Sequence, residues 1–178
     1  NSYMPAQTKA GQIDVPVFRM LGSDPIYQYG RVHGMYTLEP VYGNSGGSEK
    51  WVNWFMKNLI EQASLAFAYT QAGQENSFGW DGMKNGLTMQ IQLLEKQSKA
   101  GDIQVMTLQQ SGEWFKKHHP LTPPTSMVCM DDWKDEGRRT VWYNSRFYRM
   151  NLLWEKDAFF IRDLHRFDEK VESVTHDR

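Results

Sequence analysis

A polar loop at residues 70–81 carries the side chains best suited to binding chemistry. It follows an apolar run at 65–69 and precedes a helical pattern that starts at about Asp81. This order predicts a strand, a loop and a helix, and ligands of α/β proteins bind at such loops. The loop offers a carboxylate, three amides and an indole, from Gln71, Gln74, Glu75, Asn76 and Trp80. That set suits a neutral, hydroxyl-rich ligand; the alternative is a hydrogen-bonded connection with Asp81 as a plain helix cap.

Two further loops carry carboxylates and phenols. Asp24, Tyr27 and Tyr29 follow an apolar run at 16–21, again where a strand should end. Residues 30–48 are rich in glycine and include Glu39, which predicts a long irregular loop. Irregular loops of more than about 12–15 residues are uncommon in compact domains and are often functional. We therefore expect Asp24 and Glu39 to lie near the same site as Glu75.

Three helices and three strands are predicted in the first 124 residues. Helices are expected from Ser48 to Gln62, from Asp81 to Ala100 with Gly101 after the last turn, and after a capping box of Thr107 and Gln110. Strands are expected at 16–21, 65–70 and 103–107. Alternation of strands and helices predicts parallel strands with helical crossovers, in a doubly wound sheet or a (β/α) barrel.

The pattern changes near residue 125, beyond which only strands are expected. They span 126–130, 140–143, 146–154 and 158–167, and the turn at 155–157 predicts an antiparallel hairpin with one packed face and one wet face. A complete eight-unit barrel needs about 250 residues, whereas this chain has 178. Either the parallel sheet is small and open, or the chain is the latter portion of a larger enzyme.

Composition excludes several classes of protein. The net charge is −1 and no basic stripe is visible, so we expect no nucleic-acid partner. No apolar run approaches the roughly 20 residues that cross a bilayer, so no membrane span is predicted. Cys129 is the single cysteine, which excludes an internal disulfide. Arg138 and Arg139 stand beside acidic residues, and we interpret them as part of a solvated turn.

Four segments resemble a group of bacterial glycoside hydrolases with the (β/α) barrel of the glycoside hydrolase/deacetylase type. They are residues 16–29, 38–42, 68–80 and 141–148. In this superfamily the barrel is often seven-stranded and is followed by β-rich domains. The resemblance implies that residues 1–124 are the C-terminal portion of a barrel and that 125–178 are an antiparallel β segment that starts a β-rich domain. It also favours a periplasmic or secreted location. An open half barrel would expose apolar surface, so an N-terminal fragment of the same parent chain or a homo-oligomer is the expected protein partner.

A glycoside hydrolase acting on oligo- or polysaccharide needs two carboxyl groups, one as acid and one as nucleophile or base. We expect Glu75 with Asp24 to act as this pair, and Glu39 next. The remaining loop residues would contact the carbohydrate. Tyr27, Tyr29 and Trp80 would stack on sugar faces, and Gln71, Gln74 and Asn76 would bind hydroxyls. No cofactor is expected.

Two alternatives stay open. A metal-dependent polysaccharide deacetylase of this barrel type would need an Asp/His cluster, but the sequence has no His-x-x-x-His pair. We interpret the adjacent His118 and His119 as cations at a helix C-terminus, and we therefore assign no metal ligand. A non-catalytic carbohydrate-binding fragment is the second alternative, and it would tolerate Glu75→Gln without loss of affinity.

Overall fold

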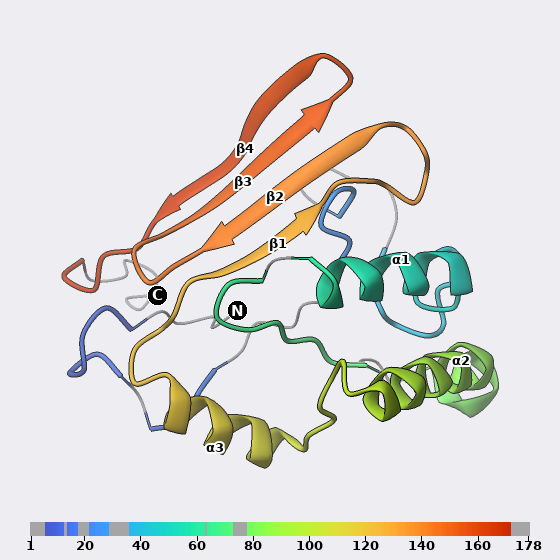
Figure 1. Ribbon diagram of the computed structural model, residues 1–178, viewed down its shortest axis with the longest axis horizontal. Coiled ribbons are helices and arrows are strands. Elements are labelled where there is room, and N and C mark those ends of the chain that lie inside the picture. Colours follow the sequence, from blue (N-terminus) through green and yellow to red (C-terminus); the bar gives the residue numbers. More distant parts are fainter. Residues whose placement is uncertain are drawn as a thin grey trace.

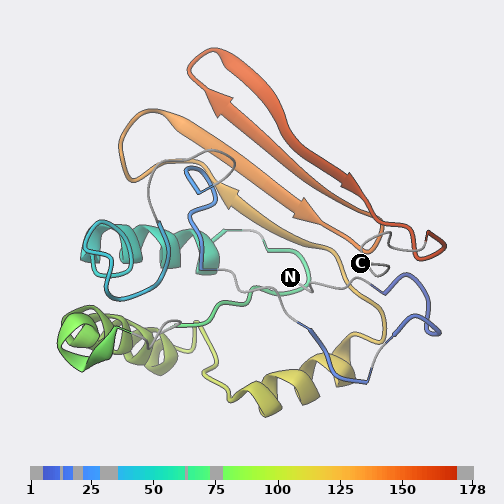
Figure 2. The same cartoon turned by 180° about the vertical axis from the view of Figure 1, so that it is seen from behind.

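The computed structural model of the protein describes residues 6–12, 14–17, 22–28, 36–62, 64–72 and 78–171. Within these residues three helices precede a four-stranded antiparallel sheet, so the fold is mixed α/β (Figure 1). Both views place the helices on the β1 side of the sheet, with β4 farthest from them (Figure 2). No helix in this part of the chain is long and apolar enough to cross a membrane.

The three predicted helices are confirmed, and local capping signals set their ends. Helix α1 spans Glu49–Ile60, and the side chain of Ser48 accepts a hydrogen bond from the backbone of Trp51. Helix α2 spans Gly79–Ala100 and ends at Gly101, whose φ of 86° is the left-handed conformation that glycine adopts without strain. It begins before Asp81, which therefore lies in the first turn and is not the cap. Helix α3, Leu108–His118, begins with the predicted capping box of Thr107 and Gln110.

The four C-terminal strands are also confirmed. They are β1 (Thr125–Cys129), β2 (Arg138–Asn144), β3 (Tyr148–Glu155) and β4 (Ala158–Arg166). They pair in sequence order, all antiparallel, and the ladder of β3 and β4 has an irregularity beside Asn151 and Leu152. The hairpin predicted at 155–157 joins β3 to β4.

The parallel strands predicted at 65–70 and 103–107 are wrong. Residues 103–107 form no strand, and in 65–70 only Leu65 forms an isolated antiparallel bridge, with Thr125. Residues 14–17 are not a strand either, and 18–21 lie outside the described residues. An apolar run becomes a strand only beside a partner strand, and beyond the bridge of Leu65 the described residues supply none for these runs. A (β/α) barrel is accordingly not formed by the described part of the chain.

The core lies between α1 and the sheet. Helix α1 buries one face, with the rings of Trp51 and Phe55 stacked at 5.0 Å. Met127 and Cys129 on β1 and Leu153 on β3 close the core from the sheet side. Because residues 127, 129 and 153 share one face of the sheet, that face is the packed one.

Helix α2 lies directly against the loop that contains Glu39. The buried amide of Gln90 donates to the carbonyl oxygens of Leu38 (2.8 Å) and Gly46 (2.7 Å). A Cβ built on Gly86 would lie 2.3 Å from the carbonyl oxygen of Pro40, so only glycine fits at this contact. The helix therefore fixes the loop at 38–47 through backbone contacts.

This contact predicts different effects for two glycines of α2. Gly86→Ala should lower the free energy of unfolding by about 1–3 kcal/mol, because the added methyl group overpacks the contact with Pro40. The matched control is Gly82→Ala, where the nearest atoms to the new Cβ lie at 3.9 Å. It should be neutral or stabilise by up to about 1 kcal/mol, since alanine favours helix. Urea unfolding measures both, and equal effects would contradict the packing described here.

Candidate functional site

Two of the predicted site loops pair with each other. Ser23 and Thr37 form an antiparallel bridge, the backbone N–H of Asp24 donates to Tyr36 O (2.8 Å), and that of Leu38 donates to Gly22 O (2.7 Å). These bonds hold residues 22–24 beside residues 36–38. The segments that carry Asp24 and Glu39 are therefore neighbours.

The start of α2, which follows the loop of Glu75, lies beside the segment after Glu39. The rings of Tyr42 and Phe78 meet edge to face at 6.1 Å, and a Cβ on Gly82 would lie 3.9 Å from Val41 Cγ2. Trp80 lies in the first turn of α2 and is 63 % exposed. We name the surface formed by 38–42 and 78–82 the loop surface. It presents Trp80 to solvent, as a sugar-stacking ring requires.

Asp24 is buried, and both of its carboxylate oxygens accept hydrogen bonds. Oδ1 accepts from the backbone N–H groups of Ile26 and Tyr27, each at 2.8 Å. Oδ2 accepts from the indole N–H groups of Trp51 (2.9 Å) and Trp133 (2.7 Å). These donors occupy the roughly four acceptor sites of a carboxylate. Asp24 therefore joins a loop, α1 and the β1–β2 connection, which is a positioning role, and its predicted role in bond cleavage stays a prediction.

Tyr27 is buried as well, in place of the predicted stacking position. Its hydroxyl lies 2.9 Å from Asp132 Oδ1 and 3.1 Å from Glu136 Oε2. Burial, followed by the hydrogen bonds to these two carboxylates and their charges, raises its pKa far above the ordinary value. The Nζ of Lys134 lies 4.2 Å from the ring centroid. The ring faces are enclosed by protein, so Tyr27 positions the β1–β2 connection.

Asp132 organises that connection, and sequence reasoning did not identify it. Besides the Tyr27 hydroxyl, its carboxylate accepts the backbone N–H groups of Lys134 (2.9 Å), Glu136 (3.2 Å) and Arg138 (2.7 Å). Burial acts to raise its pKa, but these hydrogen bonds outweigh burial, and the pKa is lowered. The available signal was an aspartate in a short connection between two predicted strands, because aspartate side chains in turns commonly accept hydrogen bonds from the backbone two residues further along.

Arg138 corrects a second interpretation of this connection. The expected solvated turn is instead partly packed, because Arg138 is half-buried and donates to Glu155 Oε1 at 2.7 Å. Lys134 also lies among aromatic rings, 4.5 Å from the centroid of Tyr36 and 5.2 Å from that of Trp133. Lys134 of the connection rests on aromatic rings and Arg138 at the start of β2 pairs with a carboxylate, which is a stabilising arrangement.

The remaining predicted residues fall into two groups. Glu39 and Gln71 are half-buried, and Glu39 follows the backbone pair of Leu38 and Gly22. The others lie outside the described residues, so their predicted roles rest on the sequence. They are Tyr29, Gln74, Glu75 and Asn76.

The histidines and the cysteine of the described chain are placed among aromatic or apolar groups. His118 stacks on Trp114 at 5.0 Å in the last turn of α3, and His119 stacks on Phe67 at 5.5 Å. Burial and the neighbouring His118 lower the pKa of His119. Cys129 is buried, which raises its thiol pKa. No group of three or more His, Cys, Asp or Glu side chains among the described residues could hold a metal ion.

The comparisons with known proteins add no relative. No protein-family model matches the sequence, and neither a curated protein nor a solved structure matches the chain.

The hydrogen bonds of Asp132 predict a pH-dependent stability. Folding favours the ionised form of Asp132. Its contribution to the free energy of unfolding is therefore complete above about pH 4 and is lost as the pH falls through the lowered pKa of this carboxyl group. Asp132→Asn should lower the free energy of unfolding by about 2–4 kcal/mol at pH 7, with a smaller difference from the native protein below pH 4.

The matched control is Asp135→Asn in the same connection. The Asp135 side chain is 84 % exposed and forms an ion pair with Lys50 at 3.3 Å. Exposed pairs contribute about 0–1 kcal/mol, so this variant should stay close to the native stability. Chemical unfolding at several pH values measures both variants. A loss at Asp132 that does not change with pH would contradict the assignment of an ionised, hydrogen-bonded carboxylate.

Proposed function

We propose that this chain is part of a glycoside hydrolase that acts on an oligo- or polysaccharide through carboxylates of its loops. The observation that carries the proposal is that described parts of three predicted site segments lie beside one another, two of them at the loop surface. Residues 22–24 pair with 36–38, and 40–42 lie beside 78–82. A site assembled from several loops on a fixed scaffold is typical of enzymes that act on extended substrates.

The burial of Asp24 changes the proposed division of roles. Its oxygens are occupied by donors from two indoles and two backbone groups. The acid and the nucleophile or base are therefore proposed to be Glu75 and Glu39. Asp24 is proposed to fix residues 22–24, which pair with the residues directly before Glu39. Retaining enzymes place their two carboxyl groups about 5–5.5 Å apart and inverting enzymes about 6.5–9.5 Å apart, so this pair defines the stereochemical outcome.

A partial barrel remains part of the proposal as the scaffold of this site within a longer protein. Segments 64–72 and 103–107 form no strand apart from the isolated bridge of Leu65, but they come before α2 and α3 in the sequence, in the order that barrel strands and their helices follow. They expose apolar side chains: Leu65 is 56 % exposed and Val105 69 %. Such exposure suits segments whose neighbouring strands come from an N-terminal fragment of the same parent chain.

The solvent-exposed indole of Trp80 also supports carbohydrate binding without cleavage, the second candidate function. Trp80→Ala should weaken binding of a soluble oligosaccharide at least tenfold, because a stacked ring contributes apolar contact at a sugar face. The control is Phe159→Ala, since Phe159 is similarly exposed, at 53 %, but lies on β4 away from the loop surface. Calorimetric titration against a panel of oligosaccharides measures both variants. Equal affinities of the two variants would contradict a role for Trp80.

Turnover separates the hydrolase from the binder. Glu75→Gln and Glu39→Gln should each lower kcat by a factor of about 100 or more while the substrate still binds, because a proton transfer or a nucleophile is lost and the shape is kept. The control is Glu113→Gln on the exposed side of α3, which should leave kcat unchanged. Release of reducing sugar measures the rate. Binding that survives in all three variants, with no turnover by the native chain within its full parent protein, would favour the binding module.

A further inference from the structure

The sheet has a second face that carries an almost continuous apolar surface. The register alternates side chains, so the face opposite Met127, Cys129 and Leu153 is defined by their neighbours in the strands. We name it the outer face. Its apolar and aromatic members are Val128, Val141, Tyr143, Tyr148, Met150, Leu152, Trp154, Phe159, Ile161 and Leu164.

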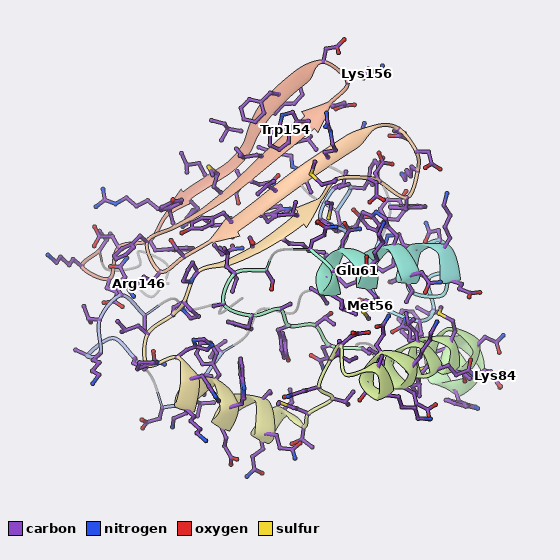
Figure 3. The ribbon with its side chains drawn as sticks, viewed as in Figure 1. Met56, Glu61, Lys84, Arg146, Trp154 and Lys156 are labelled. Atoms are coloured by element: carbon purple, nitrogen blue, oxygen red, sulfur yellow. The ribbon has the colours of Figure 1, made fainter. Side chains whose placement is uncertain are left out.

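Ring contacts join members of the outer face on neighbouring strands at both ends of the sheet. Tyr143 and Tyr148 lie with ring centroids 5.3 Å apart toward one end of the strands, and Trp154 and Phe159 lie 5.1 Å apart at the other. Figure 3 shows Trp154 on the sheet near the hairpin turn of Lys156, remote from Met56 in α1. The outer face therefore extends along the strands from the Tyr143 end to the hairpin.

The outer face is most exposed along β4. Ile161 is 62 % exposed and Leu164 67 %, and the members on β1, β2 and β3 are mostly half-buried by one another. The only other positions on this face are Ser126, Arg139 and Arg166. It therefore carries no carboxylate, and both cations lie at strand ends. An apolar patch of this extent marks an interaction surface in soluble proteins.

We propose that the outer face packs against the outer face of a second copy of this chain, so that two four-stranded sheets form a sandwich. A face without carboxylates needs no complementary charges in its partner, and the two arginines at strand ends can stay in solvent at the rim. An identical face meets both conditions. Two antiparallel sheets that bury alternating apolar residues pack about 10 Å apart.

The size of the face is sufficient for a specific dimer. Strands about 4.8 Å apart with a rise of about 3.3 Å per residue give a four-stranded face of roughly 450 Å² in projection. Its relief makes the area buried by two copies on the order of 1,000 Å² or more, close to the lower limit for a specific interface. We therefore expect a dimer with a dissociation constant in the micromolar range.

Two neighbouring residues of β4 test this interface because they point to opposite faces. Ile161 pairs with Leu152 on the outer face, and Phe160 pairs with buried Leu153 on the other. Ile161→Glu should raise the dissociation constant about 100-fold, because it places a carboxylate from each copy in an apolar interface. Phe160→Glu, at a side chain that is 46 % exposed, should change it less than about threefold. Sedimentation equilibrium of the full chain, with circular dichroism to confirm folding, measures both.

A third variant separates this dimer from association through the surface at 64–72 and 103–107. Val105→Glu changes an exposed residue of that surface and should leave the dimer intact. The proposal is overturned if the native chain stays monomeric up to about 200 µM, roughly a hundred times the expected dissociation constant. It is also overturned if Val105→Glu dissociates the dimer, or if Phe160→Glu weakens it as strongly as Ile161→Glu. None of these results depends on carbohydrate binding, so they leave the proposed function to its own tests.

Discussion

The buried carboxylate of Asp24 is the interaction on which the arrangement of this protein depends. It joins the backbone of residues 26 and 27 to the indole of Trp51 on α1 and the indole of Trp133 in the β1–β2 connection. A buried charge is tolerated only when hydrogen bonds replace its hydration, and here every acceptor site is used. The helical part and the sheet are thus held together at a defined geometry.

The same loop is fixed to the sheet at a second place. The carbonyl oxygen of Pro25 accepts from Trp142 Nε1 and Arg162 Nη2, each at 2.8 Å, and Arg162 also donates to Asn151 Oδ1 at 2.5 Å. Residues 22–24 pair with 36–38, and Gln90 of α2 donates a hydrogen bond to Leu38 O. These hydrogen bonds fix the position of the loop surface relative to the sheet. The structure therefore separates positioning groups, which are buried, from the exposed Trp80 that can meet a ligand.

Local sequence signals predicted the helices and the C-terminal strands. The partners of Asp24 and the absence of strands at 65–70 and 103–107 depend on contacts between residues far apart in the sequence. Ser48, Gly101 and the pair Thr107 and Gln110 marked the helix ends because capping involves residues a few positions apart. The role of Asp24 could not be read in this way, since its partner Trp133 lies 109 residues away. Likewise the runs at 65–70 and 103–107 have strand composition, but a strand also requires a neighbour that composition does not specify.

The central claim, that the loop surface binds a carbohydrate, is tested most directly by a ¹⁵N–¹H NMR titration of the indole N–H signals with oligosaccharides. Trp80 on α2, Trp154 on β3 and the pair of Trp51 and Trp133 at Asp24 report on separate parts of the fold. The account predicts that the Trp80 signal shifts with ligand, while those of Trp51 and Trp133, bonded to Asp24, and of Trp154 on the outer face stay in place. No shift at Trp80 with any oligosaccharide, or shifts confined to Trp154, would contradict it.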